Sequence, residues 1–192
     1  MFIINKLKLD TKKIITIIIA YLVYVNFFKG YLAFLPTLPV YPNNEKEVEL
    51  VKEEIKTRRP EDIDFFYMTN KTVVTAFLPH VNESKKELDK LILDMKTKFI
   101  VRINKYLINR ARPSQVCSSI TPIDTSTAET PSYPAGHAFQ AYVLYKKLSN
   151  KYPEKEGLLK DIAMRCDDCR IKCGLHYPSD GEYSRRLVEM FY

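Results

Sequence analysis

Three short stretches of this 192-residue chain combine side chains that can hold an anion and move protons. The last stretch runs from Cys169 to Asp180, and in it Arg170 is followed after five residues by His176 and after three more by Asp180. A carboxylate four residues beyond a histidine can orient the ring and fix its tautomer. An arginine slightly upstream can hold an anion against that ring, although a solvated helix end would carry the same residues.

The first stretch is Lys105, followed after six residues by Arg112 and Pro113. Seven residues make nearly two helical turns, so the two cations start on one face, about 10 Å apart along the axis. Pro113 disfavours the helical conformation at Arg112 and turns that residue into an extended segment. Two long cations can therefore converge on one anion, although a solvated basic helix end has the same pattern.

The middle stretch is Ser132-Tyr-Pro-Ala-Gly-His137, which we expect to open a helix. Gly136 allows close approach of the backbone to a ligand. The free N–H groups and the dipole at a helix start favour an anion, and His137 would lie beside it. Taken together, the three stretches supply three cations, a backbone cradle and two of the three histidines in the chain. Phosphoryl transfer requires these parts.

The order Lys-x6-Arg-Pro, Pro-Ala-Gly-His and Arg-x5-His-x3-Asp resembles the type 2 phosphatidic acid phosphatase superfamily, which includes class A acid phosphatases and vanadium haloperoxidases. The match covers residues 105 to 180, and the segments around the two histidines look most like the acid phosphatase branch. The resemblance implies an all-α fold, a helical bundle of the acid phosphatase and haloperoxidase type. It also implies a site without metal or cofactor that vanadate inhibits.

The resemblance also implies a role for each matched residue. His176 would attack phosphorus and form a phosphohistidine, with Asp180 orienting the ring. His137 would protonate the leaving oxygen and then help to activate water. The phosphoryl oxygens would be bound by cationic side chains and one backbone group: Lys105, Arg112, Arg170 and Gly136.

Two positions depart from the usual motifs of this superfamily. Ala135 stands where the second motif usually has serine, which removes one hydroxyl contact worth about 1 kcal/mol. Cys169 stands where the third motif usually has serine before its arginine. Neither change removes a residue with an essential role, so we expect an active enzyme.

The leading hypothesis is a metal-independent phosphatase that acts on phosphomonoesters. One alternative is a lipid-phosphate phosphatase at a membrane, although the multispanning members of that branch need several apolar spans and this chain has at most one. A vanadate-dependent haloperoxidase is a second alternative, but those enzymes are usually much larger. The third is a non-enzymatic, membrane-anchored helical protein whose cysteines bind metal.

The composition of the chain favours some classes of binding partner over others. The formal net charge of +7 suits an anionic partner, either a phosphorylated small molecule or a lipid phosphate, although it also serves solubility. The basic residues are spread along the chain without a dense patch interleaved with aromatic residues, which disfavours nucleic acid. Five glycines form no Gly-rich nucleotide-binding loop.

Three of the four cysteines, Cys166, Cys169 and Cys173, fall within eight residues. Their spacing differs from a paired zinc knuckle but, with Cys117, approximates part of an iron–sulfur site. On a helix the three would share one face as buried small hydrophobes, which we favour. A disulfide from Cys117 to that face is a further alternative in an oxidising compartment.

Residues 1–42 are predicted to form an N-terminal hydrophobic anchor or signal-like segment with a Pro-rich connector, and residues 43–192 a single helical phosphatase domain. Basic residues precede the apolar run Ile14–Phe28, which is short of the ~20 residues of a spanning helix but resumes up to residue 35. The absence of a small-x-small cleavage site favours a retained anchor, with a core helix or strand as the alternative. The protein would then be membrane-anchored or secreted, with its catalytic domain extracytoplasmic or lumenal.

Apolar periodicity predicts the helices of the larger domain. Val48, Val51 and Ile55 recur at helical spacing, so residues 43–58 should form an amphipathic helix with a solvated face. A 3-4 rhythm from Leu88 to Leu107 predicts one long helix as the spine of the core. Further helices are expected at about 137–150 and 154–173, and in a last segment that Asp180 should cap.

Overall fold

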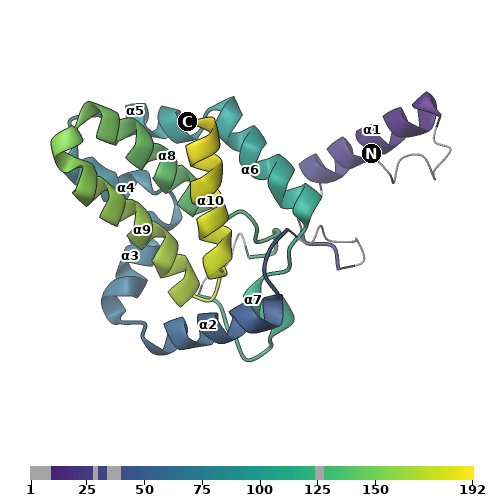
Figure 1. The fold of residues 1–192 in the computed structure, drawn as a ribbon, viewed down its shortest axis with the longest axis horizontal. Helices are drawn as coiled ribbons and strands as arrows, with labels where there is room; N and C mark the ends of the chain where they lie inside the picture. The colour runs from purple at the N-terminus through teal and green to yellow at the C-terminus, as the bar shows by residue number, and fades with distance from the viewer. Residues whose placement is uncertain (1–9, 28–29, 34–39, 124–127) are drawn as a thin grey trace. The chain divides into compact units, whose positions relative to one another are not determined.

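The structure is a computed structural model that describes residues 10–27, 30–33, 40–123 and 128–192. Its regular secondary structure is all helical, with no strand among these residues, which confirms the predicted all-α class (Figure 1). The helices in chain order are α1 (Thr11–Phe27), α2 (Asn44–Lys56), α3 (Pro60–Asn70), α4 (Val74–Phe77), η2 (Leu78–His80), α5 (Lys85–Ile92), α6 (Met95–Ile108), α7 (Pro113–Val116), α8 (Gly136–Lys151), η3 (Pro153–Lys155), α9 (Glu156–Lys172) and α10 (Pro178–Phe191).

The chain divides into two compact units, Met1–Gly30 and Tyr31–Tyr192. This division comes earlier in the chain than the predicted boundary between residues 42 and 43. Tyr31 belongs with the larger unit because its backbone N–H donates to the carbonyl oxygen of Glu129 at 2.7 Å. The larger unit contains every residue that the three sequence motifs place in the candidate site.

The first unit contains α1, a helix of 17 residues whose apolar side chains from Ile14 to Ile19 are exposed. In the described ranges, no helix is both long enough and apolar enough to cross a membrane. Within the predicted hydrophobic segment, residues 28–29 and 34–35 lie outside the described residues. The connector prolines Pro36 and Pro39 lie outside the described residues.

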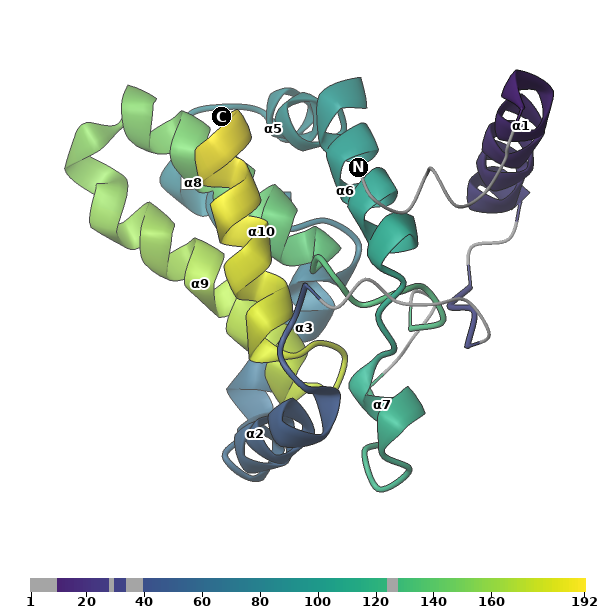
Figure 2. The same cartoon turned by 45° about the vertical axis from the view of Figure 1, so that its right-hand side comes forward.

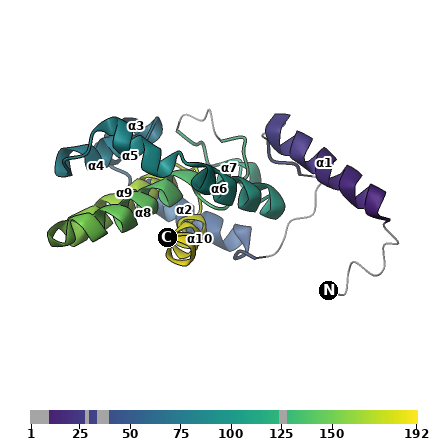
Figure 3. The same cartoon turned by 90° about the horizontal axis from the view of Figure 1, so that it is seen from above.

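The centre of the larger unit is α8, which carries buried side chains on most of its circumference, as a fully surrounded helix does. A short connection through η3 folds α9 back beside α8, and α10 packs against both (Figures 1 and 2). Seen from above, α3, α4 and α5 lie on one side of α8 and α9, and α10 lies on the other (Figure 3). The large apolar side chains between these layers include Phe66, Phe77, Phe139, Leu144, Leu148 and Leu159.

The prediction of one long helix as the spine of the core is wrong. The segment forms two helices, α5 and α6, because the Asp94 side chain accepts a hydrogen bond from the Thr97 backbone N–H at 2.7 Å and so starts a new helix. On α6, Met95 is 80% exposed, Phe99 64% and Leu107 49%, so three of the five residues of the apolar rhythm on this helix face solvent. The core is built on α8 instead.

The predicted amphipathic helix is confirmed as α2. Val48 and Val51 are buried in a second apolar cluster with Tyr177, which directly follows His176. This packing holds α2 against the start of α10. It also brings the buried carboxylate of Glu47, on the same helix, to the candidate site.

Candidate active site

His176 and Asp180 are held together by the start of α10. Tyr177 is the N-cap residue and Pro178 takes the first helical position, where its missing N–H costs nothing. The Asp180 carboxylate turns back and accepts from the Tyr177 backbone N–H at 3.0 Å, which is one half of a capping box. The same Oδ2 atom lies 3.0 Å from Nδ1 of His176. Asp180 is therefore the third residue of the helix. The prediction that it is the N-cap residue is wrong by three positions.

The partners of His176 determine its tautomer. A carboxylate can only accept, so Nδ1 carries the proton and Nε2 keeps a lone pair. Nη1 of Arg112 lies 3.3 Å from Nε2 and donates toward that lone pair. Burial, and then the charge of Arg112, lowers the pKa of His176 to about 3. The ring is therefore neutral at physiological pH, with an unprotonated nitrogen next to a cation.

Arg112 is locked in place by backbone groups. Pro113 starts α7, and Arg112 before it is extended, with φ −80° and ψ 161°, as the motif predicts. Its guanidinium donates to the Leu175 carbonyl at 2.8 Å, to the Thr130 carbonyl at 2.7 Å and to the Thr130 hydroxyl at 3.0 Å. Burial lowers the pKa of Arg112 to about 10, which still leaves it charged at neutral pH.

Asp180 has a second side-chain partner, the cation Arg110, which none of the three sequence motifs includes. Arg110 is fully buried, and its Nη1 donates to Asp180 Oδ1 at 2.7 Å and to the Ser179 hydroxyl at 2.7 Å. Its Nη2 donates to Glu47 at 2.5 Å, and its guanidinium lies 3.9 Å from the ring centre of Tyr177. The alternation of Arg110 and Arg112 was an available signal, because residues two apart in an extended chain point to the same side.

Asp180 is ionised in this network. Burial alone would raise its pKa, but the hydrogen bond with His176 and the charge of Arg110 outweigh burial, and the net shift is downward. Both of its oxygens are used, Oδ2 by His176 and Tyr177 and Oδ1 by Arg110. The carboxylate therefore cannot rotate without breaking several charge-assisted hydrogen bonds.

His137 lies on the first turn of α8 and is held by a backbone group. Its Nε2 lies 2.9 Å from the carbonyl oxygen of Asn70, the last residue of α3. A carbonyl can only accept, so Nε2 carries a proton and Nδ1 is the nitrogen left to exchange one. Burial, followed by the charge of Arg170 and then those of Lys105 and Arg112, lowers the pKa of His137 to about 3.

Arg170 near the end of α9 is fixed by the same end of α3. Its Nη1 donates to the Thr69 hydroxyl at 2.7 Å and its Nη2 to the Thr69 carbonyl at 2.9 Å. Its Nε is buried and has no hydrogen-bond partner among the described residues. Thr69 and Asn70 therefore position one cation and one histidine, a role that no motif spacing in the sequence indicates.

Lys105 and Gly136 complete the predicted set. Nζ of Lys105 donates to the Pro131 carbonyl at 2.5 Å, and burial together with the charge of Arg112 lowers its pKa well below the usual range. Gly136 begins α8, and no side chain caps this helix start. The first backbone N–H groups of α8 have no partner within the helix, and such groups bind anions at helix N-termini. A Cβ at Gly136 would meet only Val101, at 3.8 Å, so packing alone does not require glycine.

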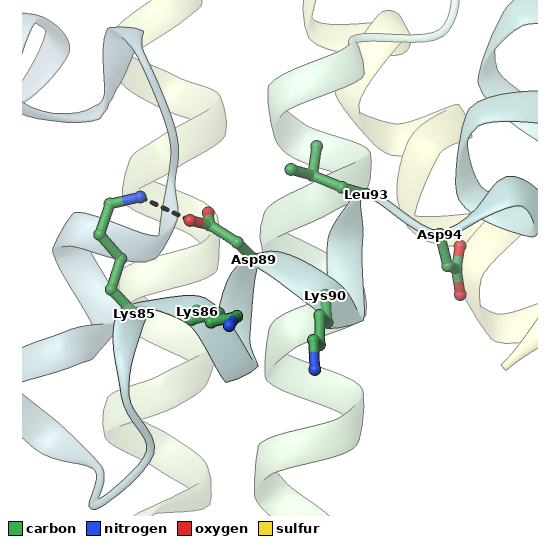
Figure 4. A pocket seen from close by; sticks show the side chains of 6 residues that line it. All are labelled: Lys85, Lys86, Asp89, Lys90, Leu93 and Asp94. Atoms are coloured by element: carbon green, nitrogen blue, oxygen red, sulfur yellow. Dashed lines mark hydrogen bonds and ion pairs between the residues drawn. The ribbon is translucent and has the colours of Figure 1, made fainter.

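Two hollows differ in their relation to this site. A surface hollow of about 610 Å³ on α5 is lined by Lys85, Lys90 and Asp94 among others and contains none of the candidate residues. Figure 4 shows the Lys85 ammonium there directed at Asp89. A smaller cavity of about 250 Å³ is lined by Lys105, Thr130 and Gly136. The smaller cavity therefore adjoins the candidate chemistry.

Three of the cysteines lie on the helix that carries Arg170 or at its end. Cys166, Cys169 and Cys173 are buried, as the hydrophobic interpretation predicts, and Cys117 is half-buried. All four are free thiols, so the alternative disulfide is not formed. Among the described residues, no group of three or more histidine, cysteine, aspartate or glutamate side chains is arranged to hold a metal ion.

The seven predicted residues lie in one compact unit. Direct contacts join Asp180, His176 and Arg112. After burial, the charges of Arg170 and Lys105 lower the pKa of His137, and the charge of Lys105 also lowers the pKa of His176. Comparison of the chain with protein-family models and with curated proteins gives no match. The chemistry of the site is therefore inferred from its geometry.

Proposed function

We propose that this protein is a metal-independent phosphatase that hydrolyses phosphomonoesters through a phosphohistidine intermediate on His176. One observation carries the proposal: the bonded series Asp180, His176, Arg112 presents a neutral imidazole lone pair directly beside a guanidinium. A nucleophile next to an anion-binding cation is what a phosphate ester requires. A carboxylate that orients the histidine is the usual third member of such an arrangement.

In the first step, Nε2 of His176 attacks phosphorus while the bond from phosphorus to the ester oxygen breaks. The Nε2 lone pair forms the new P–N bond, and the leaving oxygen takes the electrons of the broken bond. A proton from Nδ1 of His137 neutralises that oxygen, so the alcohol departs. Arg112, Lys105 and the Nε of Arg170, which has no hydrogen-bond partner in the described part of the chain, bind the three equatorial oxygens. The start of α8 contributes backbone N–H groups.

In the second step, water attacks the phosphohistidine. Nδ1 of His137 accepts a proton from the water, the P–N electrons return to Nε2 of His176, and inorganic phosphate leaves. Because the ring of His137 gives a proton in one step and takes one in the next, the cycle restores the enzyme.

The lowered pKa of His137 fits this cycle. Burial lowers this pKa most in the free site, and three cations lower it further; a bound phosphate dianion neutralises those same cations. Substrate binding therefore raises the pKa of His137, and the ring gains its second proton when the leaving group needs it. His176 is bonded to an ionised carboxylate and remains the nucleophile.

The test is hydrolysis of p-nitrophenyl phosphate by the full chain, with and without a chelator and with vanadate. We expect activity that resists the chelator and is inhibited by vanadate. His176→Ala should lose activity by at least about 10³-fold, because it removes the nucleophile. His80→Ala, which removes the third histidine on η2, is the matched control and should retain activity. Equal activity of His176→Ala and wild type would disprove the mechanism.

A further inference from the structure

The cavity beside the site lies between α6 and the start of α8, and its wall is basic. Lys98, Arg102 and Lys105 line it from α6, with Thr130 and Gly136 opposite. None of the described residues that line it is acidic. The cations therefore create a positive potential inside a concave surface, where it is screened less than on a flat one.

The three cations are spaced along one face of α6. Four residues separate Lys98 from Arg102 and three separate Arg102 from Lys105, which is the i, i+4, i+7 pattern of one helix stripe. At about 1.5 Å per residue, Lys98 and Arg102 lie roughly 10 Å and 5 Å along the axis from Lys105. Lys105 binds the transferred phosphoryl group in the proposed mechanism, so the same helix face carries two further cations within roughly 10 Å of it along the axis.

The leaving group should point toward these cations. In-line displacement puts the leaving oxygen opposite His176, where His137 donates its proton. His137 directly follows Gly136, which lines the cavity. The volume of about 250 Å³ is below the range of about 300–1,000 Å³ usual for drug-sized ligands, which favours a compact leaving group.

We propose that this cavity binds a second anionic group on the leaving-group side, so that the preferred substrates are compact phosphomonoesters carrying a further phosphate or carboxylate. Lys98 and Arg102 are the residues that select them. This inference rests on the proposed phosphatase function and adds the substrate class. A phosphate and a carboxylate are bound by the same kind of charge-assisted hydrogen bond, so the experiment tests a substrate of each kind.

The experiment compares kcat/KM within two matched pairs of substrates. Glycerol phosphate and phosphoglycerate differ by a carboxylate, and fructose monophosphate and fructose bisphosphate differ by a phosphate. We expect the wild type to prefer the more anionic member of at least one pair by about 10-fold. The double variant Lys98→Ala, Arg102→Ala should bring that ratio close to one. Raising the salt from about 0.05 M to about 0.5 M should also reduce it.

The matched control is Lys86→Ala, Lys90→Ala, which removes the same charge from the hollow on α5 and should leave the ratio unchanged. If the wild type hydrolyses all four esters without preference, this inference is overturned while the phosphatase proposal stands. The same holds if both double variants lower the ratio equally, because the effect would then be one of net charge. If the wild type hydrolyses neither these esters nor p-nitrophenyl phosphate, the proposed function fails, and this inference with it.

Discussion

The two histidines of the site have pKa values lowered to the same degree but are held in opposite ways. His176 donates from Nδ1 to an ionised carboxylate that Arg110 and a capping box hold in place. His137 donates from Nε2 to a neutral backbone carbonyl at the end of α3. The nitrogen left open is therefore Nε2 in one ring and Nδ1 in the other.

This difference separates the two roles. The carboxylate partner makes the His176 ring more basic and more nucleophilic than it would be without that partner. It adds no net negative charge, because Arg110 neutralises Asp180. The carbonyl partner fixes the orientation of His137, while the proton affinity of that ring is set first by burial and then by the surrounding cations, whose charge a bound anion offsets. Three predictions test this contrast and a fourth tests a buried carboxyl group on α9; they run from the largest expected effect to the smallest.

Asp180→Asn should have the largest effect. An amide can donate to Nδ1, which would move the proton to Nε2 and remove the nucleophilic lone pair. We expect kcat for p-nitrophenyl phosphate to fall by about 10⁴-fold, the cost of the wrong tautomer in a comparable histidine–carboxylate pair. Circular dichroism should confirm that the helices remain. A loss of less than 10-fold in a folded variant would show that the carboxylate does not set the tautomer.

Arg110→Ala should destabilise the fold as well as the site. It leaves the buried carboxylates of Asp180 and Glu47 without their shared cation. Removing one partner of a buried ion pair costs about 3–5 kcal/mol, so the urea midpoint should fall clearly. Thr69→Val, which removes one hydroxyl bond to the charged Arg170, should cost less, about 1.5–3 kcal/mol. Similar losses in the two variants would contradict the contrast between a charged and a neutral support.

His137→Ala should distinguish proton donation from binding. For an alkyl phosphate such as glycerol phosphate, loss of the general acid should lower kcat by about 10²–10³-fold. For p-nitrophenyl phosphate, whose leaving group is stable as an anion, the loss should be much smaller. Equal losses for the two substrates would assign His137 to binding and not to proton transfer.

Asp167→Asn should change the pH dependence of stability. Asp167 on α9 lies against Gly181, where an added Cβ would come within 1.7 Å of its Oδ2. Burial, and then the charges of Asp168 and Asp180, raises its pKa to about 8. The folded state therefore holds a proton that the unfolded chain loses above pH 4, so stability falls by up to about 1.4 kcal/mol per pH unit as pH rises toward 8. The melting temperature of the variant should change less between pH 5 and pH 8 than that of the wild type. An equal change with pH in the two proteins would contradict this prediction.

Much of the candidate site could be predicted because the signals are local. The four-residue spacing of His176 and Asp180 becomes a contact at one helix start, and Pro113 keeps Arg112 extended. The break between α5 and α6 was also readable, since Asp94 is a strong N-cap residue. Periodicity alone joined the two helices because the apolar rhythm runs through the break.

The sequence by itself determined the helical class, the residues of the three motifs and their local geometry, because capping, proline sterics and helical spacing act over a few residues. Only the tertiary structure decided what supports them. Arg110 reaches Asp180 across 70 positions of the chain, and Thr69 reaches Arg170 across 101. Such contacts depend on how α2, α3, α9 and α10 pack together, and buried charges take whichever partners that packing brings within hydrogen-bond distance.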